Sequence, residues 1–160
     1  MDIRNADPSE RDMLARLWHD AWRDAHLAIV PAELARLRTL ANFHERLATM
    51  LPELRVAGPV GSPRGFSMVS GDELSQFFVD AVHRGTGVAQ ALLNDAESRF
   101  RMCGVRTPWL ACDVGNDRAA RSYEKCGWRR VRTEIYLCET SEGPFPLDVW
   151  RYEKDLVPAA

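Results

Sequence analysis

Hydrophobic residues follow a helical spacing in the first third of the chain. Apolar residues recur there every three or four positions, which predicts two amphipathic helices. The first stripe comprises Leu14, Leu17, Trp18 and Ala21, and the second comprises Leu34, Leu37, Ala41, Leu47 and Leu51. Asp7, Pro8 and Glu10 form the sequence pattern of a capping box, so the first helix is predicted to begin there. Pro31 separates the two helices and Pro52 ends the second.

The spacing changes after residue 53. Short apolar runs predict strands over 54–58, 65–69 and 74–80, after an edge-like first strand over 2–6. The later elements are a helix over 87–102, a strand over 109–114, a short helix over 118–127 and two strands over 128–139 and 147–154. This order predicts an α+β, or mixed α/β, fold in a single domain spanning residues 1–160. The strand–helix–strand unit should place strands 74–79 and 109–113 parallel in one sheet.

The composition is that of a globular protein without a nucleic-acid partner. Hydrophobic residues make up 46% and charged residues 28%, and the net charge is -2, so a general basic surface is missing. No apolar run reaches the ~20 residues that cross a bilayer, and the segment MDIRNADPSERD is too polar for a signal peptide. We therefore expect a soluble cytoplasmic protein that does not bind membranes.

The four cysteines and four histidines do not form a metal-binding pattern. Cysteines occupy positions 103, 112, 126 and 138 without a C-x-x-C pair, so we expect reduced thiols that act as small core residues. The histidines are scattered, and neither H-E-x-x-H nor G-x-S-x-G occurs. No metal site is predicted, and the metalloprotease and serine hydrolase classes lack support.

The loop RGTGVA, residues 84–89, joins a predicted strand to a predicted helix. Helix N-termini carry free N–H groups and a partial positive charge, and glycine lets the backbone approach a ligand closely. Arg84 adds a charged donor. The loop alone is equally compatible with a phosphate site and with a simple turn. It lacks the Walker G-K-[ST] sequence, and Gln90 stands where the Rossmann pattern needs a small residue.

Two sequence blocks resemble the GNAT superfamily of N-acetyltransferases. Residues 84–89 match its [R/Q]-x-x-G-x-[G/A] core, with Val79 five residues upstream. The block GNDRAARSYEKCGW matches N-x-x-A-x-x-x-Y-x-x-x-G-[F/W] through Asn116, Ala119, Tyr123, Gly127 and Trp128. Two blocks in the expected order are more specific than either alone. The resemblance implies a GNAT-like fold, with a central, mostly antiparallel twisted sheet, a parallel β-α-β cofactor-binding unit and flanking helices.

The resemblance implies acetyl-CoA as the cofactor. In the family, the strand before the loop pairs with the pantetheine arm like an added strand, which here means Phe77, Phe78 and Val79. The pyrophosphate would lie on the loop and the start of the helix, namely Arg84, Gly85, Thr86, Gly87, Val88, Ala89 and Gln90. Asn116 would face the cofactor where the parallel strands separate, and it is also well placed to cap the following helix.

Acetyl transfer to an amine requires a neutral amine, a donor to the developing oxyanion and protonation of the leaving thiolate. The resemblance assigns the acid to Tyr123, and the alternative is a structural tyrosine that covers the cofactor sulfur. The backbone N–H of Phe77 or Phe78 is the expected oxyanion donor. Some family members carry a base as Glu in a Leu-Glu-Val triplet, but Ala111 stands at that position here. The base is therefore open among Glu73, Asp80, Asp113, Glu134 and a water relay.

The acceptor pocket is expected between the first two helices, their connection and the final hairpin. Trp18 and Trp22 are predicted to be core residues rather than acceptor contacts, and His26 is predicted to be an exposed polar residue. The leading hypothesis is an acetyl-CoA-dependent enzyme that acetylates a primary amine of a small molecule or a peptide. The alternative is a CoA-binding sensor or an inactive paralogue. Relatives of this kind are often dimers, so a homodimer is one expected assembly.

Overall fold

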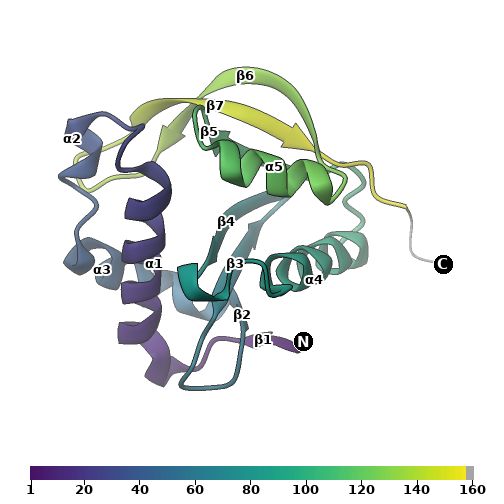
Figure 1. The fold of residues 1–160 in the computed structure, drawn as a ribbon, viewed down its shortest axis with the longest axis horizontal. Helices are drawn as coiled ribbons and strands as arrows, with labels where there is room; N and C mark the ends of the chain where they lie inside the picture. The colour runs from purple at the N-terminus through teal and green to yellow at the C-terminus, as the bar shows by residue number, and fades with distance from the viewer. Residues whose placement is uncertain (158–160) are drawn as a thin grey trace.

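The computed structural model describes residues 1–157, which form one seven-stranded sheet with helices on both faces (Figure 1). The strands are β1 (Ile3–Asn5), β2 (Leu54–Ala57), β3 (Gly65–Ser70), β4 (Glu73–Val79), β5 (Trp109–Asp113), β6 (Arg129–Cys138) and β7 (Phe145–Glu153). The α-helices are α1 (Arg11–His26), α2 (Ala32–Ala35), α3 (Leu40–Met50), α4 (Val88–Met102) and α5 (Asp117–Lys125). Short 3-10 turns cover Pro8–Glu10, Leu51–Glu53 and Ala81–His83. The predicted mixed α+β class is confirmed.

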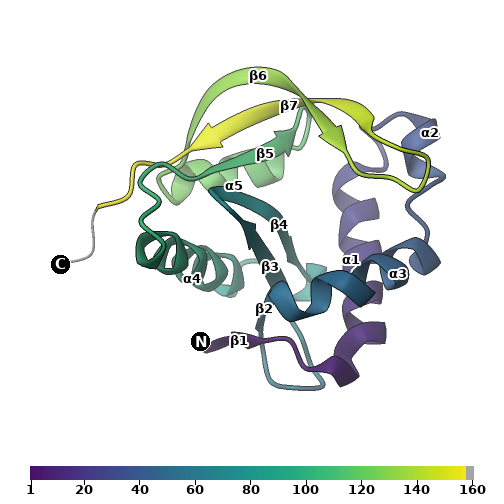
Figure 2. The same cartoon turned by 180° about the vertical axis from the view of Figure 1, so that it is seen from behind.

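The sheet consists of two antiparallel parts joined by one parallel pair. Its strand order is β1-β2-β3-β4-β5-β7-β6, and β4 and β5 are the parallel pair, as predicted. Only Glu73 and Trp109 are in register there, at the start of both strands. Beyond that point the two strands diverge, which is visible from both sides (Figures 1 and 2). The edge of β4 that faces β5 therefore lacks a strand partner from residue 74 onward within the described chain.

The capping box at the start of α1 forms as the sequence predicts. The Asp7 side chain accepts a hydrogen bond from the Ser9 N–H, and Glu10 reaches back to the Asp7 N–H at 3.0 Å. The prediction of a single second helix over residues 34–51 is wrong, because the chain forms α2 and α3 with a break between them. Thr39 is the reason: its side chain accepts from the Asn42 N–H at 3.0 Å and starts a new helix.

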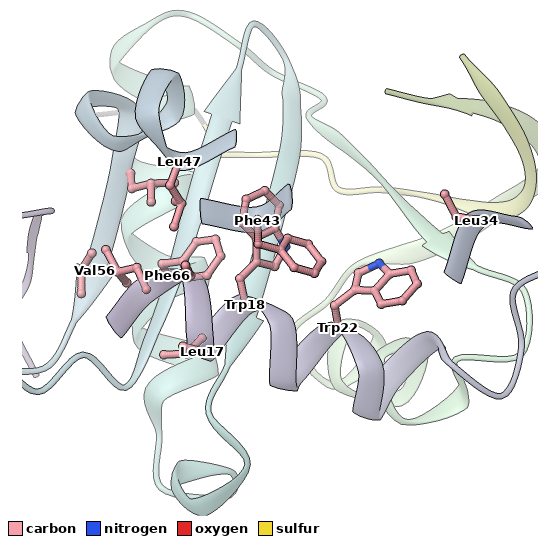
Figure 3. Packing of buried hydrophobic residues seen from close by; sticks show 11 residues of the cluster. Leu17, Trp18, Trp22, Leu34, Phe43, Leu47, Val56 and Phe66 are labelled. Atoms are coloured by element: carbon pink, nitrogen blue, oxygen red, sulfur yellow. The ribbon is translucent and has the colours of Figure 1, made fainter. Parts of the chain in front are cut away.

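The two larger of three hydrophobic clusters lie on opposite faces of the sheet. The first joins α1, α2 and α3 to β2, β3 and Phe78 of β4, and Trp18 packs at its centre against Phe43 and Phe66 (Figure 3). The second joins α4 and α5 to Leu74 and Phe77 of β4 and to β5 and β7. Phe77 and Phe78 thus face different cores, as alternation along a strand requires. Leu74 shares the core of Phe77 because the β3–β4 pairing shifts register between Gln76 and Leu74. No helix in residues 1–157 is long and apolar enough to cross a membrane.

Candidate active site

A cleft of about 1180 Å³ passes through the sheet where β4 and β5 separate. The loop between β4 and α4 borders the cleft, and α5 lines it on the same side of the sheet. On the other side it is lined by α1, α3 and the end of β6. The predicted acceptor elements and the predicted cofactor elements therefore meet in one cavity.

The N-terminus of α4 has the backbone of an anion site. Gly85 and Gly87 have φ angles of 75° and 89°, in the left-handed region that favours glycine. A Cβ atom built on either residue would meet no protein atom within 4 Å, so the space in front of the loop is open. A side chain there would project into that space. The helix N–H groups and the open backbone fit a pyrophosphate.

Arg84 is not a free cation at this loop. Its guanidinium forms an ion pair with Asp24 of α1, and Arg118 at the start of α5 lies 3.6 Å from the same carboxylate. The two arginines lower the pKa of Asp24 below its usual range, mainly through the hydrogen bond from Arg84. The Asp24 carboxylate thus pairs with two arginines that line the cleft, Arg84 of the loop before α4 and Arg118 of α5.

Most of the residues predicted from the sequence line the cleft. They are Phe77, Phe78, Val79, Arg84, Gly85, Gly87, Ala89, Gln90, Asn116 and Tyr123. Thr86 and Val88 do not line it. The Thr86 hydroxyl donates to the His83 carbonyl, and the Val88 side chain is buried against Leu92. The Val88 side chain is therefore withdrawn from a ligand, whereas Thr86 is exposed.

Asn116 sits at the separation of the strands, where the sequence places it. Its side-chain oxygen accepts from the Ala119 N–H at 3.4 Å, so it caps α5. The cap leaves its amide nitrogen without a protein partner within residues 1–157, and Asn116 borders the cleft. Capping and a cofactor contact are compatible at this residue.

Tyr123 is buried on the α5 side of the cleft. Its ring packs against Phe77 and Tyr152 at centroid distances of 5.8 and 5.9 Å, and 7% of the residue is exposed. Burial raises the pKa of Tyr123 above its ordinary value, so the phenol stays protonated at neutral pH. Its hydroxyl has no hydrogen-bond partner among the described residues. The group can therefore donate to a ligand in the cleft.

Two of the four carboxylates considered as bases, Glu73 and Asp113, line the cleft. The Tyr136 hydroxyl donates to Glu73 at 2.7 Å, and burial raises the pKa of Glu73. Burial likewise raises the pKa of Asp113, whose carboxylate lies 3.5 Å from His26 Nε2. Asp80 and Glu134 lie outside the cleft lining, and Glu134 is paired with Arg132 at 3.0 Å.

The prediction that His26 is an exposed polar residue is wrong. Its side chain is 12% exposed, and its ring packs between Trp22 and Phe78 at 5.4 and 6.2 Å. Burial lowers the pKa of His26, although the Asp113 charge opposes that shift. Trp18 and Trp22 are core residues, as predicted, and they also border the cleft.

Sequence reasoning missed two arginines of the cleft, Arg38 and Arg46. Arg46 occupies one position of the amphipathic helix FHERLATML, where a charged residue usually faces solvent. Its guanidinium instead lies over Trp18, with the guanidinium carbon 4.3 Å from the ring centroid. No local sequence signal marks either arginine, because the α1–α3 packing and the β6 end bring them into the cleft.

All four cysteines are free, as predicted, but they are not all core residues. Cys112 is buried, Cys126 and Cys138 are half-buried, and Cys103 is exposed. Burial raises the pKa of the Cys112 thiol to about 12, so it does not serve as a nucleophile at neutral pH. Within residues 1–157, no group of three histidine, cysteine, aspartate or glutamate residues is arranged to hold a metal ion.

Comparison with known proteins identifies the class to which this fold and cleft belong. Residues 11–128 match the Acetyltransferase (GNAT) family, and the chain therefore belongs to that family. The resemblance drawn from the two sequence blocks is confirmed. No curated protein matches the chain in sequence.

Solved structures share the fold over nearly the whole chain. A protein described as "GCN5-Related N-acetyltransferase: Aminotransferase, Class-II" from Rhodopseudomonas palustris has a TM-score of 0.75 at 18% identity, covering 97% of this chain and 95% of its own. A PaiA N-acetyltransferase from Thermoplasma acidophilum, solved with coenzyme A, has a TM-score of 0.68 at 14% identity, covering 97% and 98%. YncA from Salmonella typhimurium, a putative acetyltransferase solved with acetyl-CoA, has a TM-score of 0.65 at 17% identity, covering 100% and 96%.

The family and the cleft agree on the cofactor. Acetyl-CoA is the cofactor of this family, and two of the structural neighbours contain coenzyme A or acetyl-CoA. The open space at Gly85 and Gly87 and the unpaired edge of β4 fit a pyrophosphate and an extended arm.

Proposed function

We propose that the protein transfers an acetyl group directly from acetyl-CoA to a primary amine of a small molecule or a peptide. One observation carries the proposal. The unpartnered edge of β4 lies in a single cleft with a buried phenol on one side of the sheet and two carboxyl groups on the other. A donor for the leaving group and an acceptor for the amine proton therefore face the same space from opposite sides.

The acetyl thioester supplies an electrophilic carbon and a thiolate leaving group, and the protein's residues handle the protons. Glu73 is the best-placed base, because it is ionisable, half-buried and held by Tyr136. Its raised pKa brings it closer to neutral pH, which favours proton acceptance. Asp113 is the second choice, because its carboxylate already faces His26.

Tyr123 is proposed to donate a hydrogen bond, and then a proton, to the leaving sulfur. It lies against Phe77, and the open edge of β4 runs past both residues. A backbone N–H of Phe77 or Phe78 would stabilise the developing oxyanion. Burial keeps the Tyr123 phenol protonated over the whole neutral range, so the donor is present when the substrate binds. The tyrosinate left by the transfer takes up a proton from solvent before the next turnover.

The test is release of free thiol from acetyl-CoA in the presence of an amine panel. The panel contains polyamines, amino acids, aminoglycosides and short peptides, and acetyl-CoA binding is measured in parallel by calorimetry. We expect amine-dependent thiol release with at least one class. Tight acetyl-CoA binding without turnover on any class would contradict the proposal.

The second candidate is a CoA-binding sensor or inactive paralogue. The observation in its favour is Ala111, which stands where some family members carry a catalytic glutamate. Glu73 and Asp113 line the cleft and supply carboxyl groups that Ala111 lacks. The turnover experiment separates the two candidates, since both require acetyl-CoA binding and only the enzyme releases thiol.

A further inference from the structure

Two arginines face the acceptor side of the cleft without a carboxylate partner. Arg38 lies in the break between α2 and α3, and Arg46 lies two turns further along, on α3. Neither takes part in any ion pair of the described chain. Two other charged groups of the cleft do have such partners, since Arg84 pairs with Asp24 and Asp113 lies 3.5 Å from His26.

Arg46 is half-buried and lies over two aromatic rings, but no anion pairs with it. Its guanidinium carbon lies 4.3 Å from the Trp18 ring centroid and 5.8 Å from that of Phe43, and no hydrogen bond from the guanidinium to the described residues is present. Burial, and to a lesser extent the positive charge of Arg38, lower its pKa to about 10. The N–H donors of this half-buried guanidinium are therefore free to bind an anionic ligand.

Arg38 is nearly buried and only partly satisfied. It is 5% exposed, and it donates to the Glu139 carbonyl at 2.7 Å and to the Asn42 side chain at 3.5 Å. The Glu139 carboxylate is the acidic group whose charge acts on both arginines, but that residue is exposed and forms no ion pair with either. The guanidinium donors that remain can therefore serve a ligand.

The rest of the acceptor side completes a two-ended pocket. Glu73 and Asp113 supply carboxyl groups, and Trp22, Phe78 and Met68 supply apolar surface. A small amine with an acid group would place its ammonium or amine near the carboxyls and its anion at the two guanidiniums. Planar guanidinium groups bind a carboxylate through paired N–H donors.

We propose that Arg38 and Arg46 form a carboxylate subsite, and that the acceptor amine belongs to the class of small amino carboxylates such as amino acids. This inference rests on the proposed acetyl transfer, because a bound amino carboxylate is an acceptor only if that transfer occurs. The subsite itself is a statement about binding and can be tested without turnover.

The binding test uses the protein saturated with coenzyme A, which has no acetyl group to transfer. The probes are the reaction products N-acetyl-L-phenylalanine, N-acetyl-L-methionine and N-acetyl-L-leucine, each compared by calorimetry with its primary amide. Each pair differs only in the carboxylate, and neither member has a titrating amine. We expect the acid of at least one pair to bind ten- to a hundredfold tighter than its amide, the range of a charge-assisted hydrogen-bond pair.

The variant Arg46→Gln should remove that preference, while Arg46→Lys should retain part of it. Arg23→Gln is the matched control, because Arg23 is an exposed residue of α1 outside the cleft lining and loses the same charge. Arg46→Met keeps an unbranched apolar side chain beside Trp18 and removes the charge, and thermal unfolding of every variant separates lost binding from lost folding. Equal binding of acids and amides, no binding of either, or an unchanged preference in a folded Arg46→Gln protein would each overturn the subsite.

The amine panel distinguishes this inference from the proposed function. If the acids bind with the expected preference and no amine is acetylated, the carboxylate subsite stands and the enzyme proposal fails. If polyamines or amino acid amides are acetylated as well as the amino acids, the enzyme proposal stands and the assignment of the acceptor to amino carboxylates fails, whatever the binding test shows for the subsite.

Discussion

Tyr123 is the residue whose role is most open to direct measurement. Phenylalanine removes only the hydroxyl, and the ring contacts with Phe77 and Tyr152 remain. If the hydroxyl protonates the leaving sulfur, Tyr123→Phe should lower kcat about a hundredfold, the usual effect of losing a general acid. The Kd for acetyl-CoA should change less than about threefold, since a single uncharged donor is lost. A steady-state turnover assay measures kcat and calorimetry measures the Kd, both on the same preparation. Unchanged kcat would make Tyr123 a structural residue.

Glu73 and Tyr136 allow the base to be identified from the pH dependence. A base must be ionised, so activity falls at low pH as Glu73 takes up a proton. The Tyr136 hydroxyl donates to Glu73 and lowers its pKa, against the larger opposite effect of burial. Tyr136→Phe therefore raises the pKa of Glu73, and the acidic limb of kcat/KM should move to higher pH by about one unit.

His26→Gln is the control for that pH shift. The His26 charge lowers the pKa of Asp113, and Glu73 has no contact with His26 among the described ion pairs and hydrogen bonds. If Asp113 were the base, the acidic limb of kcat/KM would shift in the His26→Gln variant and would not shift in the Tyr136→Phe variant. Using one acceptor throughout removes the contribution of the amine's own titration.

Residues with a motif could be predicted, and residues without one could not. Tyr123 and Asn116 are recognised because their spacing is repeated in a family pattern over a dozen neighbouring positions. His26 and Asp113 meet at 3.5 Å from positions far apart in the chain. Arg46 is read locally as the polar face of a helix, and only the packing of α3 on Trp18 turns it inward. Such contacts are set by tertiary packing, which one sequence does not encode in any local spacing.

At the scale of elements, α1 and the α4 loop are linked through Asp24. This carboxylate pairs with Arg84 and Arg118, two of the cations that line the cleft near the α4 loop and α5. Asp24→Asn frees both guanidiniums and removes a negative charge that repels phosphate. We expect the Kd for coenzyme A to fall about two- to fivefold at low ionic strength, the effect of one partly exposed charge interaction. The gain should shrink as salt rises.

Asp20→Asn provides the matched control for that change. Asp20 lies one turn earlier on α1 and is exposed, with His19 as its partner at 2.9 Å. The variant changes the net charge by the same amount without touching either arginine. Equal tightening in both variants would indicate a general charge effect, and no tightening in Asp24→Asn would show that Arg84 does not contact the phosphates.

Element boundaries show where sequence patterns are reliable. The helix predicted over 87–102 is observed as Val88–Met102, and its stripe of Val88, Leu92, Ala96 and Phe100 is fully buried. That agreement reflects a strong periodicity bounded by glycine. The prediction of a single second helix was wrong because the apolar spacing continues across residues 36–39, where α2 has ended and the Thr39 cap starts α3. A side chain that can cap a helix offers the backbone an alternative to a continuous helix, and at Thr39 the chain adopts that alternative.

At the scale of the whole molecule, the sheet has two parts that share little backbone pairing. β1–β4 and β5–β7 are each antiparallel, and one residue pair, Glu73 and Trp109, joins them in register. The two cores likewise lie on opposite faces and meet through β4. A ligand that pairs with the open edge of β4 and reaches the α4 N-terminus would add contacts between the parts. Binding should therefore stabilise the molecule as a whole and protect that edge locally.

Coenzyme A at a hundred times its Kd should add about 2.7 kcal/mol to the free energy of unfolding. For a domain of this size that corresponds to a Tm increase of roughly 5–10 °C. Hydrogen exchange should slow most at the amides of 77–79 and 85–90, where the open edge and the loop would receive the cofactor. Gly87→Asp is the control, because a carboxylate in a left-handed backbone at φ 89° both strains the loop and repels phosphate. That variant should lose the Tm increase and the protection together, whereas protection confined to β6 and β7 would place the cofactor elsewhere.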